Sequence, residues 1–441
     1  MHISVSARPQ VQRALILAPL LLLLAWSIGA LVASDDAQTM PAIVILSLLT
    51  VVSFILFWQV SRSDPQGSTL FLVLLASFGL KLLAMFFRFN FGLLADSYAY
   101  DLHGERIAGE IARGQWPENV GAYGSAFVRL ATGLVYYAMG VTHYGVSMLW
   151  SWFGLLGMLF FYLTFRTAFP EGNRRLYMFL IFLYPSLLLW TSSLGKDALM
   201  VMFLGMAAYG AARLQHRLES IGLWWLALGI GGAFMIRPHL SSVFVVALGA
   251  STLIRPIRAG PLTPIIRFGG VIMMAAISVA LISSASGYVG LESVGTEEVF
   301  RFIDEFQEQS ARGGSAFEQV DPRTPAGFAM AIPTVLFRPF LWEAHNLNAL
   351  IASLEGVGLM MLMLFRWRSV GAALLATFRS SYMMLVGVFV VLFILFFSAI
   401  GNFGIIVRER ASQLFPFVLM WIAYLGPRAA DTTSSSERRG V

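Results

Sequence analysis

Long apolar runs alternate with short polar segments along almost the whole chain. A helix needs about 20 apolar residues to cross a hydrocarbon core of about 30 Å. The runs that we predict to be membrane spans cover residues 14–33, 42–60, 69–87, 143–165, 177–193, 197–213, 221–236, 240–254, 269–286, 345–365, 382–399 and 411–425. Helices satisfy their own backbone hydrogen bonds in lipid, and the runs lack the alternation of barrel strands. The pattern predicts an all-α, polytopic membrane protein with about 12 transmembrane helices.

One apolar run does not fit this alternation. Residues 125–139 are apolar but include Arg129, and counting them as a span would place the basic segment 166–175 outside. We therefore predict a re-entrant or interfacial segment here.

Two polar segments are long enough to hold structure of their own. Residues 96–118 have apolar positions at helical spacing and end at Gly114 and Pro117, which predicts an amphipathic helix. It is either a solvated helix at the membrane surface or a catalytic segment. Residues 296–312 predict a second amphipathic helix, and the glycines and prolines after it predict a loop through Pro325 and Pro333.

The composition agrees with a membrane protein. The chain is 58% hydrophobic and only 12% charged, whereas charged residues make up about a quarter of soluble domains. The absence of cysteine excludes disulfides, thiolate metal sites and a cysteine nucleophile. The net charge of +6 comes almost wholly from arginine and gives no indication of nucleic-acid binding.

Arginines in short loops predict the orientation, because such loops stay in the cytoplasm. Both termini are then cytoplasmic, the segments 88–142 and 287–344 are extracytoplasmic loops, and the tail 428–441 is disordered in the cytoplasm. Residues 1–441 form a single transmembrane domain in this interpretation.

The same orientation places the dense polar motifs on the extracytoplasmic side. The hairpins 177–213 and 221–254 are built from short runs that reach only about 22–26 Å, so their turns should lie below the outer membrane surface. Buried turns tolerate charge only where they line a polar cavity or pair with opposite charge.

Arginines on this side oppose the orientation bias and indicate an anionic ligand such as a phosphate. The candidate phosphate-binding residues are Lys196, Arg237, His239, Arg338, Arg408 and Arg410, and the candidate supporting residues are Asp197, Glu343, His345 and Glu409. The alternative is that the arginines bind lipid head groups or pair internally, for example with Asp197 or Glu409.

The candidate catalytic residues are Asp96, Asp101 and His103. A carboxylate near arginines stays ionised and suits a general base, and the histidine suits the same role or a proton shuttle. Their spacing is not diagnostic of a metal site, so we assign none. Glu355 lies in the middle of a predicted span, where Lys81 is the expected structural partner.

Other motifs are missing. The sequence has no phosphate-binding loop of nucleotide triphosphatases, no HExxH and no GxSxG. An ATP-driven machine or a zinc protease is therefore not expected. The sequence also has no soluble domain that could bind a sugar nucleotide, so a transferase that uses sugar nucleotides from the cytosol is not expected.

The order of the polar motifs carries a resemblance. The motifs are D-S-x-x-Y-D-x-H (96–103), Y-P-S-x-x-x-W-x-S-S-x-x-K-D-A (184–198), R-P-H (237–239), F-R-P-F-x-W-E-x-H-N (337–346) and G-N-F-G-x-x-V-R-x-R (401–410). This order resembles bacterial polytopic proteins of exopolysaccharide or O-antigen assembly, which are similar to GT-C glycosyltransferases and oligosaccharide repeat-unit polymerases. The acidic loop follows the third span here, whereas it follows the first in the usual GT-C pattern.

The resemblance implies transfer of a sugar or oligosaccharide from a polyprenyl-(di)phosphate carrier to a saccharide acceptor, at the outer face of a bacterial inner membrane. The arginines and Lys196 would hold the carrier phosphate, and Asp96 or Asp101 would deprotonate the acceptor. No cofactor is required, with a divalent metal as the alternative, and the partners are membrane lipid and other polysaccharide-assembly proteins. A transporter or flippase of lipid-linked sugars and a non-enzymatic assembly subunit stay open.

Overall fold

The computed structural model describes residues 29, 38–92, 95–117, 121, 123–217, 219–254, 269, 272, 324–398 and 400–426. Within these residues the chain forms helices and no strand, which confirms the predicted all-α class. The helices are α2 (Thr39–Arg62), α3 (Gly67–Asn90), α4 (Ala95–Ala112), α5 (Ser125–Met139), α6 (His143–Ala168), α7 (Arg174–Leu183), α8 (Pro185–Trp190), α9 (Lys196–Arg217), α10 (Ile221–Ile236), α11 (Pro238–Ile254), α14 (Pro325–Phe337), η1 (Leu341–Glu343), α15 (Leu347–Phe365), α16 (Trp367–Ala376), α17 (Ser381–Phe397), α18 (Phe403–Glu409), η2 (Arg410–Leu414) and α19 (Phe415–Ala423).

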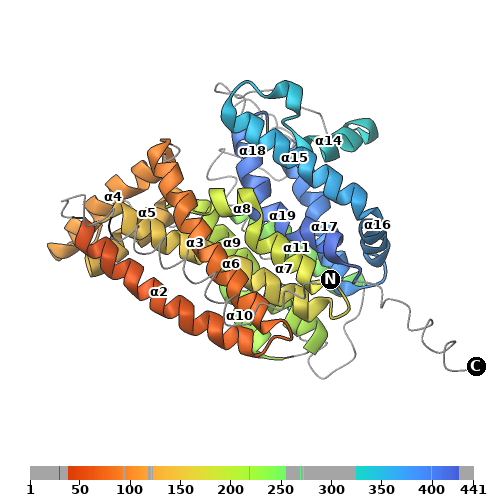
Figure 1. Cartoon of the computed structure of the whole chain (residues 1–441), viewed down its shortest axis with the longest axis horizontal. Coiled ribbons are helices and arrows are strands. Elements are labelled where there is room, and N and C mark those ends of the chain that lie inside the picture. Colours follow the sequence, from red (N-terminus) through yellow and green to blue (C-terminus); the bar gives the residue numbers. More distant parts are fainter. Residues whose placement is uncertain are drawn as a thin grey trace, which may run out of the picture.

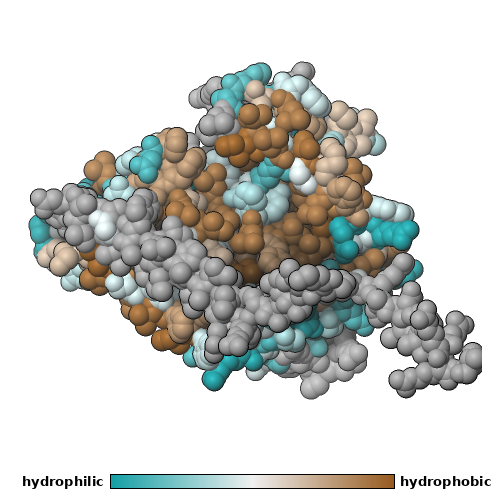
Figure 2. Space-filling model, in the orientation of Figure 1, coloured by the Kyte–Doolittle hydropathy of each residue, from teal (hydrophilic) through white to brown (hydrophobic). Residues whose placement is uncertain are grey.

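Four of these helices, α2, α3, α6 and α9, are long and apolar enough to cross a membrane. The count rises to five if α15 and α16, which meet at 78°, form one broken span. The helices α10, α11, α14 and α17 are apolar but shorter. Figure 2 shows apolar side chains over most of the described surface on one face, with polar side chains towards its edges. Several predicted segments lie outside the described residues: the span at 14–33 apart from Gly29, the span at 269–286 apart from Gly269 and Ile272, the helix at 296–312 and the tail at 428–441.

Two predicted elements differ from the structure, and proline explains both. The run 177–193 is divided at Tyr184, because Pro185 has no N–H to continue α7 and instead begins α8. The predicted loop through Pro325 is wrong, since residues 325–337 form α14. Pro325 occupies its first turn, where no intrahelical N–H is needed, and the Thr324 side chain accepts a hydrogen bond from a backbone N–H of that turn.

The helices are arranged around α6 and α9, which lie side by side (Figure 1). Small residues allow this approach: a Cβ added at Gly205 would lie 2.6 Å from the carbonyl oxygen of Gly157. Helix α10 also packs on α9, and α11 packs on α17. The short pair α4 and α5 lies at one end of the molecule (Figure 1).

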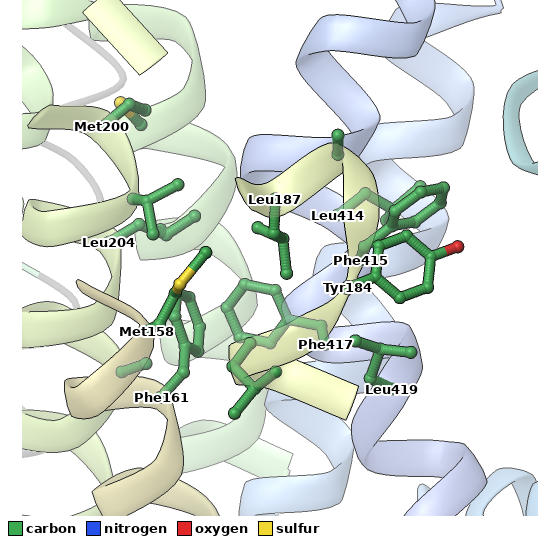
Figure 3. Packing of buried hydrophobic residues seen from close by; sticks show 14 of the residues in the cluster. Met158, Phe161, Tyr184, Leu187, Met200, Leu204, Leu414, Phe415, Phe417 and Leu419 are labelled. Carbon is green, nitrogen blue, oxygen red and sulfur yellow. The ribbon is translucent and has the colours of Figure 1, made fainter. Parts of the chain in front are cut away.

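A shared apolar core joins α6, α8 and α9 to α19, the last helix of the described chain. Figure 3 shows Met158 and Phe161 of α6, Leu187 of α8 and Leu204 of α9 facing Phe417 of α19. All five side chains are fully buried. This contact fixes α18, which precedes α19 along the chain, relative to the N-terminal ends of α6 and α9.

Polar contacts at the two ends of α6 define two ends of the helix bundle. At its C-terminal end, Arg166 forms a 3.2 Å ion pair with Asp64 of the α2–α3 turn. At its N-terminal end, the His143 ring faces α4, with Nδ1 3.6 Å from Asp101 Oδ2. The N-terminal ends of α6 and α9 lie at this second end, where the polar motifs gather.

Candidate functional site

Charged side chains from α4, α9, the α10–α11 turn and α18 meet at this end of the bundle. Arg408 of α18 donates a 2.7 Å hydrogen bond to Asp96 of α4. Its Nε also lies 3.4 Å from Asp197 of α9. These contacts join segments that lie up to 312 residues apart along the chain.

A second arginine continues the network inward. Arg237 donates a 3.1 Å hydrogen bond to Asp197 and forms an ion pair with Glu409. Gln413 donates a hydrogen bond to the other Glu409 oxygen. Asp197 therefore connects both arginines, and we call Asp96, Lys196, Asp197, Arg237, Arg408 and Glu409, together with Arg88, the polar cluster.

The cluster is graded from exposed to buried. The exposed fraction of the side chain is 62% for Asp96 and 30% for Arg408, but only 9% for Asp197, 8% for Arg237 and 6% for Glu409. Buried charges persist only when they are paired and hydrogen-bonded, as the last three are. The buried part holds the cluster together, and the exposed part is where a ligand can bind.

Local sequence positions each of these side chains. Asp197 lies in the first turn of α9, where the helix dipole favours a carboxylate. Arg237 lies between α10 and α11, because Pro238 cannot continue α10. Asn402 caps α18 by accepting hydrogen bonds from two backbone N–H groups. A π-helical segment begins at Arg410, and such segments are frequent at functional sites.

Two further cations raise the positive charge of the cluster. Lys196 lies within electrostatic range of Arg237, Arg408, Asp197 and Glu409, and its ammonium group forms no hydrogen bond or ion pair with any residue that the structure describes. Arg88 of α3 lies within range of Asp96, Asp197 and Arg408, and donates hydrogen bonds to two carbonyls of α8. The cluster therefore contains four cations and three carboxylates.

Lys196 lies close to the start of α5. The lysine side chain is partly exposed. A Cβ added at Gly124, the residue that caps the N-terminus of α5, would lie 3.9 Å from the ammonium nitrogen. Gly124 has φ +66°, a conformation that favours glycine, and its N–H donates to the Met235 carbonyl at 2.7 Å. His239 follows on α11, within electrostatic range of Lys196, with its ring stacked on Phe396.

The other candidate catalytic residues lie apart from the cluster. Asp101 accepts a hydrogen bond from the Tyr136 hydroxyl and faces His143, so both of its oxygens are engaged. His103 Nδ1 lies 2.7 Å from the Ala99 carbonyl oxygen one turn earlier in α4, and the structure shows no contact between His103 and the cluster. Of the three predicted catalytic residues, only Asp96 lies in the polar cluster.

Arg338, Glu343 and His345 form a separate group beside α18. Arg338 Nε donates to both Glu343 oxygens at 3.0 and 3.1 Å, and its guanidinium lies 5.3 Å from the Phe403 ring. Partial burial acts to raise the pKa of Glu343, but hydrogen bonds from Arg338 and the Phe340 N–H outweigh it and hold that pKa below its usual value.

Arg410 is fully buried and points away from Arg408. It donates a 3.2 Å hydrogen bond to the Val335 carbonyl and another to the Arg338 carbonyl, so it ties η2 to α14. The predicted pairing of Glu355 with Lys81 is wrong. Glu355 accepts a 3.0 Å hydrogen bond from the Ser186 N–H, while Lys81 donates to Thr191 at 2.6 Å.

Internal pairing, the alternative stated for the arginines, occurs for Arg237, Arg338 and Arg408. It does not account for Lys196. Among the described residues, no group of three or more His, Asp or Glu side chains is placed to hold a metal ion. Sequence reasoning missed Arg88 and His143, although Arg88 begins the predicted extracytoplasmic loop 88–142 and His143 begins a predicted span.

Comparison with protein-family models, with curated proteins and with solved structures finds no match to this chain. What the site does is therefore inferred from its own residues and geometry.

Proposed function

We propose that the chain is an integral membrane glycosyltransferase of the GT-C-like or repeat-unit polymerase kind. It would move a sugar or oligosaccharide from a polyprenyl-(di)phosphate carrier to a saccharide acceptor in exopolysaccharide or O-antigen assembly. The observation that carries the proposal is the excess of cations over carboxylates in a cluster built from four distant polar motifs, with Lys196 partly exposed and without a hydrogen-bond partner among the described residues.

We propose a role for each residue of the polar cluster from the exposure of its side chain. Lys196 and Arg408 would bind the carrier phosphate and stabilise the negative charge that develops on it as the glycosidic bond breaks. Asp96 is the most exposed carboxylate of the cluster and would accept the proton of the attacking hydroxyl. Arg237, Asp197 and Glu409 would hold the phosphate-binding side chains in place. No step needs a bound nucleotide or another cofactor.

The proposal includes a membrane orientation. We propose about 12 spans in a bacterial inner membrane, with the cluster at the extracytoplasmic face, α5 as a re-entrant or interfacial segment and both termini in the cytoplasm. Helix α16 and the turn after it support this orientation: Arg368 and Arg379 are exposed beside Trp367 and Phe378, as at a cytoplasmic membrane surface. The carrier phosphate would then reach the cluster from the outer leaflet.

The test is transfer by the purified protein in lipid vesicles. Radiolabelled polyprenyl-phosphate sugar and a saccharide acceptor are supplied, and formation of labelled product is measured. Replacing Asp96 by Asn or Lys196 by Gln should lower the transfer rate by at least about 100-fold. The matched control replaces Arg106 and Glu110, an ion pair on α4 in which the arginine is exposed, and should retain the activity.

The same vesicles separate the alternatives. A flippase would change the sidedness of the labelled lipid without forming a product, and its polar residues should continue through the bundle. A non-enzymatic subunit would leave polysaccharide output unchanged in the Asp96 and Lys196 variants at equal protein level. Either result would reject glycosyl transfer by this chain.

A further inference from the structure

Beyond the proposed glycosyl transfer, we propose that Ser97 is an activated nucleophile that accepts an acyl group from a carboxylic ester. His143 would act as its general base, and Asp101 would orient the histidine. Ser97 and Asp101 lie on α4, and His143 begins α6. The three residues form a second site beside the polar cluster.

The three side chains stand in the order that base-activated hydroxyls require. Ser97 Oγ lies 2.7 Å from His143 Nε2. His143 Nδ1, on the other side of the ring, lies 3.6 Å from Asp101 Oδ2. A nucleophile within hydrogen-bond reach of a base, which a third group orients, is the signature of nucleophilic catalysis, and the distances are often longer without substrate.

The Asp101 carboxylate would favour the His143 tautomer that can act as a general base for Ser97. With Nδ1 protonated towards Asp101, the lone pair of Nε2 would be left to accept the Ser97 hydroxyl hydrogen. Tyr136 donates a hydrogen bond to the other Asp101 oxygen, so the carboxylate is itself fixed. Asp101 and Tyr136 are positioning residues in this proposal, because they act through the histidine.

The surroundings exclude water from the base. The rings of Phe89 and Tyr98 contact His143 edge-on, with centroids at 4.8 and 5.0 Å. Ser97 is 2% exposed and His143 is 5% exposed, whereas Tyr98 is 52% exposed. Tyr98 therefore contacts His143 with one side of its ring and is exposed at the protein surface on the other. A substrate would reach Ser97 by displacing the Tyr98 side chain.

The position of α4 indicates the kind of ester. Tyr98 and Leu102 lie one turn apart on α4 and are exposed, as is Tyr137 on the adjacent α5. In a membrane protein, exposed apolar and aromatic side chains on such a helix pair face lipid or the membrane interface. The substrate that fits is an ester with an apolar chain, held at the membrane surface.

The reaction balances without an oxidant or a metal. Ser97 Oγ forms a bond to the acyl carbon while Nε2 takes the hydroxyl proton. The tetrahedral oxyanion forms near the first turn of α4, whose backbone N–H groups have no acceptor within the helix. The ester C–O bond then breaks, and the leaving alkoxide takes the proton from His143. Water or another alcohol releases the acyl group from Ser97 by the same steps in reverse.

A fluorophosphonate with an alkyl chain tests the proposal in the intact protein. An activated serine forms an O–P bond and expels fluoride, and mass spectrometry locates the modified residue. We expect Ser97 to be labelled in the wild-type protein. His143→Gln keeps a side chain that accepts a hydrogen bond but is no base, and should lower the labelling rate by at least about 100-fold. Ser125→Ala, on adjacent α5, should leave the rate unchanged.

Three outcomes would overturn the proposal: no label at Ser97 in the wild-type protein, label only at other residues, or an equal rate in His143→Gln. Asp101→Asn provides the test of positioning, because loss of the carboxylate should change the pH dependence of Ser97 labelling. A purely structural hydrogen bond between α4 and α6 would leave Ser97 unreactive at every pH.

Discussion

The buried ion pair between Arg237 and Glu409 gives the sharpest prediction about stability. Both side chains are less than one-tenth exposed, and Arg237 also pairs with Asp197. Removing one member of a buried pair leaves the other charge uncompensated, which costs about 3–5 kcal/mol. For Glu409→Gln we expect about 3 kcal/mol, the lower end of this range, because Asp197 still neutralises the arginine.

A double-mutant cycle isolates the interaction from the loss of packing. Arg237→Met should cost more than Glu409→Gln, up to about 5 kcal/mol, because it leaves two carboxylates short of a partner. The double variant should be less destabilised than the sum of the single variants, since neither member is then left alone. We expect a coupling free energy of about 2–3 kcal/mol.

The assay is unfolding of the purified protein by increasing SDS in mixed micelles, followed by tryptophan fluorescence. The control cycle uses Arg106 and Glu110, an ion pair of α4 in which the arginine is 63% exposed. Exposed pairs at this spacing couple by only about 0.3–0.5 kcal/mol. A coupling between Arg237 and Glu409 as small as that of the control would refute the reasoning that the pair is buried and holds α10 to α18.

Three further variants test the packing of α9 on α6, the ion pair between Arg338 and Glu343, and the N-cap of α18. Gly205→Ala should destabilise the protein by about 1–3 kcal/mol in the same unfolding assay, because its Cβ would meet the α6 backbone, whereas Gly358→Ala has open space and should be neutral or stabilising. Because hydrogen bonds from Arg338 hold the pKa of Glu343 below its usual value, this carboxylate adds stability above about pH 4.3 that is lost as the pH falls through the folded-state pKa. Glu343→Gln should therefore reduce the acid sensitivity of unfolding, and an unchanged acid profile would contradict this assignment. Asn402→Ala should cost about 1 kcal/mol through loss of the cap of α18, and no change in unfolding would show that the cap is dispensable.

Much of the secondary structure could be predicted from hydrophobic periodicity. The predicted boundaries for 125–139 and 221–236 agree with α5 and α10. Among the residues that the structure describes, four or five helices meet the length and composition of a span, so the predicted count of about 12 is not confirmed. Length alone does not tell whether a short apolar helix such as α10 crosses the membrane or is buried in protein.

The candidate site was predictable in its composition but only partly in its arrangement. The sequence indicated Asp96, Lys196, Arg237 and Arg408, and the structure brings them together. It also indicated Arg410, which lies only two residues from Arg408 but turns into the core at the start of the π-helical segment. Sequence spacing could not separate these two arginines.

The sequence by itself determined the helical class, the apolar character of the chain and the few polar segments in which charge is concentrated, because these depend on local periodicity and composition. Only the tertiary structure decided which charges meet. Packing of α6, α9 and α19 brings Asp96, Asp197 and Arg408 within hydrogen-bond reach and leaves His103 aside, and the same packing places His143 between Ser97 and Asp101. Contacts between residues far apart in sequence are fixed by how helices close over a shared core, and no local pattern encodes that geometry.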